Sequence, residues 1–205
     1  MNPFFTPLNF PAFLTIATLS GCATTGDPDS STAPTFAELQ ADLTDVADEM
    51  NTIQSQGVTP VAAFTNGNVT YSGFVEHYKG LSIIPPIPPT ETVIGELTVT
   101  ADFGTDDISV SIYNLVSDTR GPMPGTIGGD GEVVYVPTGE AANFTFDVTG
   151  SLLINGIPAD YEGGLDGTFY GNTGPDLVFV GIDGTVYYLS GATEDFDMVG
   201  YGLAD

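Results

Sequence analysis

Basic residues are almost absent from this 205-residue sequence. Lys79 and Arg120 stand against 27 aspartate and glutamate residues, which gives a formal net charge of −25. Affinity for nucleic acid depends on lysine and arginine side chains that displace counterions from phosphates, so this charge excludes nucleic acid as a partner. The same sign of charge opposes peripheral attachment to anionic lipid headgroups. Any association with a membrane therefore requires a covalent or hydrophobic anchor.

The residues that usually carry catalysis or hold metals are also scarce. The chain has one histidine, His77, and one cysteine, Cys22, so an internal disulfide is impossible. A Ser-His-Asp triad would have to use His77, and the G-x-S-x-G nucleophile motif does not occur. Zinc sites need several histidine or cysteine ligands, and pairs of carboxylates among 27 acids carry no information about acid–base catalysis. The sequence therefore predicts no catalytic residues, no metal site and no cofactor, and hence a protein that is not an enzyme.

The apolar run near the N-terminus is short. Phe10–Leu19 falls below the roughly 20 apolar residues of a membrane-spanning helix but suits the core of a signal peptide. Leu19-Ser20-Gly21-Cys22 follows and resembles the lipobox of bacterial lipoproteins, although no basic residue precedes the run. We predict a signal peptide at residues 1–21 and lipidation of Cys22. Such a protein would be anchored to the membrane by lipid at the bacterial outer membrane, facing either the periplasm or the exterior.

A tether and a helix are expected next. Residues 22–34 are small, polar and proline-containing, as in a flexible tether. Thr35 and Glu38 match the S/T-x-x-E capping box. Apolar residues at spacings of three and four then predict an amphipathic helix over 35–54. The stripe consists of Phe36, Leu39, Leu43, Val46, Met50 and Ile53. Because the opposite face is acidic, we expect the stripe to dock onto the following domain, with a coiled-coil seam as the alternative.

From residue 66 onward the apolar period changes to two. In the segment 92–103, Val93, Leu97 and Val99 alternate with Glu96 and Thr98, so one face of the strand is dry and the other wet. The same pattern predicts strands at 68–77, 108–112, 132–136, 144–154, 161–170, 176–182, 185–190 and 198–203.

Turn residues divide these strands. Asn155-Gly156 and Asp183-Gly184 both predict type I′ hairpin turns, and Pro85, Pro86, Pro88 and Pro89 predict an extended loop. Short strands without intervening helices favour an all-β fold. We predict a single antiparallel up-and-down β-barrel of about eight strands over residues 58–205, preceded by one amphipathic helix, because closure removes exposed sheet edges. A two-sheet sandwich is the alternative.

Four segments resemble the β-barrel domain of transferrin-binding protein B and its small, single-barrel lipoprotein relatives. They are Asn68–Gly73, Gly95–Gly104, Ile108–Asn114 and Gly167–Gly171. The resemblance implies an eight-stranded, surface-exposed binding lobe, often concerned with acquiring iron from host proteins or haem. After the last segment the family usually continues with an acidic residue and a Gly-Gly strand, whereas this chain has Asn172-Thr173-Gly174-Pro175-Asp176.

The functional prediction is a binding module with a protein or haem as its ligand. His77 and Tyr78 are the candidate ligand-binding residues, although a histidine at a strand end also makes ordinary hydrogen bonds. The alternatives are a structural or adhesion lipoprotein of the envelope with no small ligand, and a lipocalin-like carrier. A carrier requires a hollow barrel, and an eight-stranded barrel permits either a hollow or a filled interior.

Overall fold

The computed structural model describes residues 33–64, 67–80, 82–83, 86–135, 142–172 and 174–205. Residues 33–205 belong to one compact unit. The predicted signal peptide, the lipidation site at Cys22 and most of the predicted tether lie outside the described residues. Within the described part, no helix combines the length and the apolar character needed to cross a membrane.

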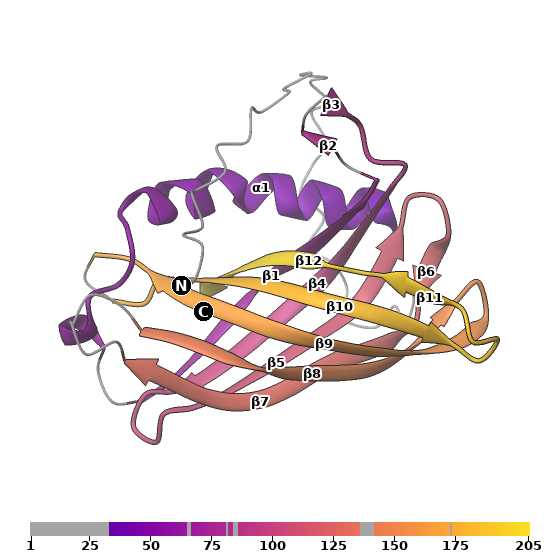
Figure 1. Ribbon diagram of the computed structural model, residues 1–205. Helices are drawn as coiled ribbons and strands as arrows, with labels where there is room; N and C mark the ends of the chain where they lie inside the picture. Colours follow the sequence, from indigo (N-terminus) through magenta and orange to yellow (C-terminus); the bar gives the residue numbers. More distant parts are fainter. Residues whose placement is uncertain (1–32, 65–66, 81, 84–85, 136–141, 173) are drawn as a thin grey trace. The chain divides into compact units, whose positions relative to one another are not determined.

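Eight antiparallel strands close into a barrel in meander order (Figure 1). Each strand pairs with the next along the chain, and β12 pairs with β1 to close the wall, from Tyr71 opposite Ala204 to Glu76 opposite Val199. The predicted barrel is therefore confirmed, and closure excludes the sandwich. The wall strands are β1 (Asn68–Lys79), β4 (Glu91–Asp102), β5 (Asp107–Ser117), β7 (Gly125–Tyr135), β8 (Ala142–Ile154), β9 (Ile157–Tyr170), β10 (Leu177–Tyr188) and β12 (Met198–Ala204).

Short strands extend the connections at one end of the barrel. β6 (Gly121–Met123) pairs with the end of β5, and β11 (Thr193–Asp195) pairs with the end of β10. β2 (Ser82–Ile83) and β3 (Pro86–Ile87) form a separate two-stranded ribbon between β1 and β4. Pro86 was predicted in a loop, but it pairs with Ile83. A two-stranded ribbon has only edge strands, where a residue without an N–H is tolerated.

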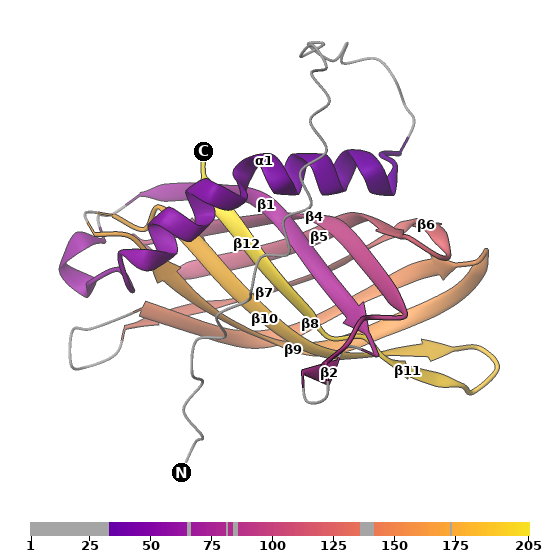
Figure 2. The same cartoon turned by 90° about the horizontal axis from the view of Figure 1, so that it is seen from above.

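Helix α1 (Phe36–Ser55) precedes the barrel and begins where the sequence indicates. The Thr35 hydroxyl accepts a hydrogen bond from the Glu38 amide, and the Glu38 carboxylate accepts one from the Thr35 amide, so the capping box is formed. Figure 2 shows α1 running across the outer face of the barrel wall. Leu39 is fully buried against Ile94 and Val116, with Phe36 and Leu43 beside it. The stripe thus docks onto the barrel, as predicted.

The barrel interior is filled by packed side chains. Buried apolar residues from all eight wall strands form one continuous cluster, because every second residue of each strand points inward. One end of the interior is aromatic. There Phe169 of β9 lies 5.3 to 5.7 Å, between ring centroids, from four other rings. These belong to Phe64, Tyr71, Phe103 and Phe144. Phe64 follows the 3-10 turn η1 (Val61–Ala63), so the segment after α1 contributes to this end of the core.

The two predicted hairpin turns have different outcomes. Asn155 and Gly156 have φ angles of 55° and 75°, so this turn is confirmed. The prediction at Asp183-Gly184 is wrong, because both residues lie inside β10, opposite Gly164 and Gly163 of β9. Gly184 is required there because the Tyr161 ring occupies the space that a Cβ would take. The segments predicted as two strands at 176–182 and 185–190 are therefore one continuous strand.

Strand β7 begins earlier than the sequence pattern indicates. It starts at Gly125, whereas the alternation predicts a strand only from Glu132. Gly128, Gly129 and Gly131 carry no side chains, so they leave no apolar period to detect. At Gly131 the ring of Phe146 from β8 covers the backbone where a Cβ would otherwise lie. Glycine therefore suits these positions of the wall, because neighbouring atoms occupy the space that a Cβ would take.

Candidate functional site

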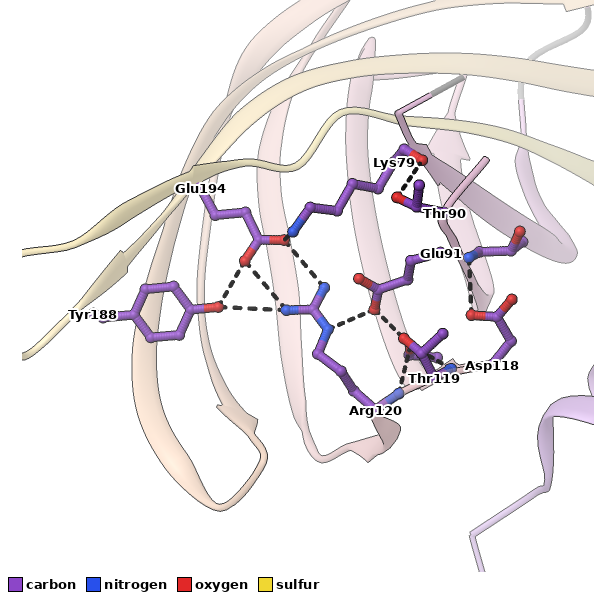
Figure 3. A network of polar contacts seen from close by, with 10 residues as sticks. Lys79, Thr90, Glu91, Asp118, Thr119, Arg120, Tyr188 and Glu194 are labelled. Atoms are coloured by element: carbon purple, nitrogen blue, oxygen red, sulfur yellow. Dashed lines mark hydrogen bonds and ion pairs between the residues drawn. The ribbon is translucent and has the colours of Figure 1, made fainter. Parts of the chain in front are cut away.

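A cluster of polar side chains occupies the other end of the barrel interior (Figure 3). Lys79 comes from the end of β1, Glu91 from the start of β4, Arg120 from the turn before β6, and Glu194 from β11. These positions are distant in sequence but meet because the meander returns every second connection to the same end of the barrel. We call these four residues, with Tyr188 at the end of β10, the ionic cluster.

Arg120 is the centre of the ionic cluster. Its Nε donates to Glu91 Oε1 at 2.5 Å, and Nη1 and Nη2 donate to the two carboxylate oxygens of Glu194, each at 3.2 Å. Lys79 Nζ reaches Glu194 Oε1 at 2.8 Å, and the Tyr188 hydroxyl donates to Glu194 Oε2 at 2.9 Å. Ser117 Oγ donates to the same Glu91 oxygen at 2.5 Å. The carboxylates of Glu91 and Glu194 thus each accept several hydrogen bonds within the ionic cluster.

The charges of the ionic cluster balance. Burial by itself raises the pKa of the Glu194 carboxyl, but hydrogen bonds from Lys79 and Tyr188 and the charge of Arg120 outweigh it, so the pKa is lowered overall. Burial disfavours the Arg120 cation, yet the bond to Glu91 and the charge of Glu194 raise its pKa overall. Two basic side chains face two acidic ones, and the pKa shifts of Glu194 and Arg120 both favour the charged forms. The cluster is suited to closing the barrel end rather than to transferring a proton.

His77 points into the barrel beside the ionic cluster. Its ring stacks on Phe196 with centroids 4.2 Å apart, and its Nδ1 lies 2.6 Å from the carbonyl oxygen of Asp197, which can only accept. Nδ1 therefore carries the proton. Burial lowers the pKa of His77 in spite of that bond and of the nearby carboxylates, which favours the neutral ring. Among the described residues, no protein group bonds its buried Nε2.

Tyr78 lies on the opposite side of the wall. Its hydroxyl donates to Glu76 Oε1 at 2.5 Å on the outer face of β1. Successive residues of a strand point to opposite faces, so the structure separates His77 from Tyr78. The two predicted ligand-binding residues do not form one site.

A cleft of about 320 Å³ lies between α1 and the outer wall of the barrel. Helix residues including Gln40, Leu43 and Met50 line one side, and Glu76 and Tyr201 line the other. Burial raises the pKa of the Glu76 carboxyl, although the hydrogen bond from Tyr78 opposes the shift. The volume of this cleft is at the lower end of the range typical of small-ligand sites, and its lining combines apolar and polar groups.

A second cleft, of about 310 Å³, lies in the outer wall over three adjacent strands. Asp102 of β4, Asp107 of β5 and Asp130 of β7 line it together with Thr100 and Ser109. Its position follows from the register, in which Asp102 is opposite Asp107 and Ser109 opposite Asp130. We call it the acidic cleft. Among the described residues, no three histidine, cysteine, aspartate or glutamate side chains are grouped so as to hold a metal ion.

The ionic cluster was not predicted from the sequence, but one signal could have identified it. Lys79 and Arg120 are the only lysine and arginine in the chain, and both reach Glu194. Rare cations among many acids are candidates for specific pairing. Comparison with known proteins finds no family model that matches the chain and no matching curated protein.

Proposed function

We propose that this chain is a lipid-anchored binding module of the bacterial outer membrane that engages a protein partner with its outer wall and catalyses no reaction. The observation that carries the proposal is the segregation of charge. Both basic residues are paired with Glu91 or Glu194 at one barrel end, so in the described part of the chain no other carboxylate has a lysine or arginine partner. The exterior of the barrel therefore presents unpaired acidic side chains. Electrostatic complementarity favours their association with a partner protein that has a basic surface.

The packing of the interior supports an external binding surface over a carrier function. Fully buried side chains such as Ile112, Ile127 and Leu165 fill the space that a carried lipid would need. Both clefts described above lie outside the wall. The resemblance to transferrin-binding protein B, whose quoted segments lie on β1, β4, β5 and β9, supports a receptor role and would make the partner an iron-carrying protein.

Lipid attachment at Cys22 is the first test. Cells that express the full chain are grown with a fatty-acid probe, and we expect label on the wild-type protein and none on Cys22→Ser, because the thioether requires the sulfur. Immunoblotting verifies equal expression of the two proteins. Label that persists in Cys22→Ser would contradict lipid attachment at Cys22.

The acidic cleft offers the test of the binding surface. The full chain is immobilised and exposed to proteins of its native surroundings. We expect a retained partner that is released by salt and lost in Asp102→Lys/Asp107→Lys/Asp130→Lys. The matched control, Asp45→Lys/Asp48→Lys/Glu49→Lys on α1, changes net charge by the same amount and should retain the partner. Binding is measured by mass spectrometry of the eluate.

Three outcomes would contradict this assignment. Equal loss in both variants would indicate non-specific attraction to charge. No retained protein at all would favour a structural envelope role. A Soret shift on haem titration that His77→Ala or Tyr78→Phe abolishes would favour haem as the ligand. We expect no such dependence, because His77 faces the packed interior and Tyr78 is bonded to Glu76.

A further inference from the structure

Four large apolar side chains are exposed at the barrel end that holds the ionic cluster. They are Leu153, Ile157, Tyr187 and Leu189, with exposed fractions of 41%, 52%, 43% and 81%. We call them the apolar rim. Exposed apolar residues grouped on one surface mark interaction sites more often than scattered ones do.

The strand register places Leu153 and Tyr187 on the same outer face of the wall, on the two strands that flank β9. Leu153 of β8 is opposite Pro158 of β9, and Tyr187 of β10 is opposite Asp160 of β9. Leu152 and Val186 are buried in the interior, so their neighbours Leu153 and Tyr187 point outward. Ile157 follows the Asn155-Gly156 turn opposite the buried Ile154, so it lies at the mouth of the barrel, and Leu189 follows the last residue of β10.

Helix α1 begins at this same end of the barrel. Leu39, in its first turn, contacts Ile94 near the start of β4 and Val116 near the end of β5. At the opposite end of α1, the side chain of Gln56 accepts a hydrogen bond from the Asn172 amide. Both views show the first residues of α1 on the side of β6 and β11 (Figures 1 and 2).

The start of α1 is where the chain that leads from Cys22 enters the barrel unit. Eleven residue steps separate Cys22 from Ala33. The 20 residues of α1 extend about 30 Å along the barrel. The chain that leads from Cys22 therefore joins the barrel unit at the end where α1 begins.

We propose that the apolar rim lies against the lipid bilayer to which Cys22 is anchored. The inference rests on the proposed lipid anchor. The bilayer surface is one of zwitterionic headgroups, because an acidic chain is repelled by anionic ones. Of the residues paired directly with the rim, Asp160 carries the one charge, and its carboxylate accepts a hydrogen bond from Ser151. The aromatic end and the acidic cleft would then face away from the membrane.

A tryptophan reporter tests this orientation, because the chain has no tryptophan of its own. Full-length Leu189→Trp is coupled through its single cysteine, Cys22, to a maleimide lipid in phosphatidylcholine vesicles with brominated acyl chains. The control is Val134→Trp, which is 60% exposed near the end of β7 at the opposite barrel end. Vesicle flotation confirms that both proteins are attached.

We expect a blue shift and loss of emission for Leu189→Trp and unchanged emission for Val134→Trp. Quenching of neither reporter, of both equally, or of Val134→Trp alone would overturn the proposal. Chemical coupling supplies the anchor whether or not cells acylate Cys22. Failure of the fatty-acid labelling would therefore refute the proposed anchor. Failure of the quenching would refute the contact between the apolar rim and the bilayer.

Discussion

Phe169→Ala is expected to lower the free energy of unfolding by about 4 kcal/mol, the cost of removing a large aromatic side chain from a packed core. Phe169 is 1% exposed, and its ring contacts Phe64, Tyr71, Phe103 and Phe144. These rings come from four different parts of the chain, so the cavity cannot close by movement of one element. Urea unfolding followed by far-ultraviolet circular dichroism measures the change.

The control for this prediction is Tyr187→Ala on the outer wall. Tyr187 is a large aromatic residue of a neighbouring strand, but it is exposed, so we expect a change within about 0.5 kcal/mol. A similar loss of stability in both variants would show that the ring cluster is not the centre of the core. A loss below about 1 kcal/mol for Phe169→Ala would show the same.

Arg120→Met is expected to lower the free energy of unfolding by about 3 kcal/mol. Removal of one member of a buried ion pair leaves the other charges uncompensated, and this costs more than the intact pair contributes. The Glu91 side chain is 7% exposed and would keep only the hydrogen bond from Ser117, while Glu194 would keep Lys79 and Tyr188. The measurement is urea unfolding at neutral pH and low salt.

Lys79→Met is the matched control, because it changes net charge by the same amount. The Lys79 side chain is 46% exposed, so its pair with Glu194 is screened by solvent and its loss should cost less than about 1 kcal/mol. Equal effects of the two substitutions would contradict a central role for Arg120. Restoration of stability by adding Glu91→Gln to Arg120→Met would confirm that the unpaired carboxylate causes the loss.

The effect of Arg120→Met should also depend on pH. The folded protein holds the pKa of Glu194 below its ordinary value of 4.5, so this group stabilises the fold above that pH and the contribution disappears as pH falls through the lowered pKa. The difference between wild type and variant should therefore narrow in acid. A difference that stays constant from neutral to strongly acidic pH would rule out an electrostatic origin.

Much of the fold was predictable because its signals are local. The capping box at Thr35 and Glu38, the spacing of the α1 stripe and the alternation in Val93, Leu97 and Val99 each depend on neighbouring residues. Alternation also implies that His77 and Tyr78 point to opposite sides of a strand, so their separation could have been foreseen. Asp183-Gly184 misled the prediction because the dipeptide also suits a strand position beneath the ring of Tyr161.

By itself the sequence determined the class of fold, the start of the helix, the alternation of inner and outer faces, and a net charge of −25. Tertiary structure alone decided which strand ends meet. It brought Lys79 to Glu194 across 115 residues, enclosed Arg120 between Glu91 and Glu194, and placed the apolar rim at the end where α1 begins. The reason is physical: side-chain periodicity is set by the backbone of one strand, whereas the neighbours at a barrel end are set by closure and register over the whole meander.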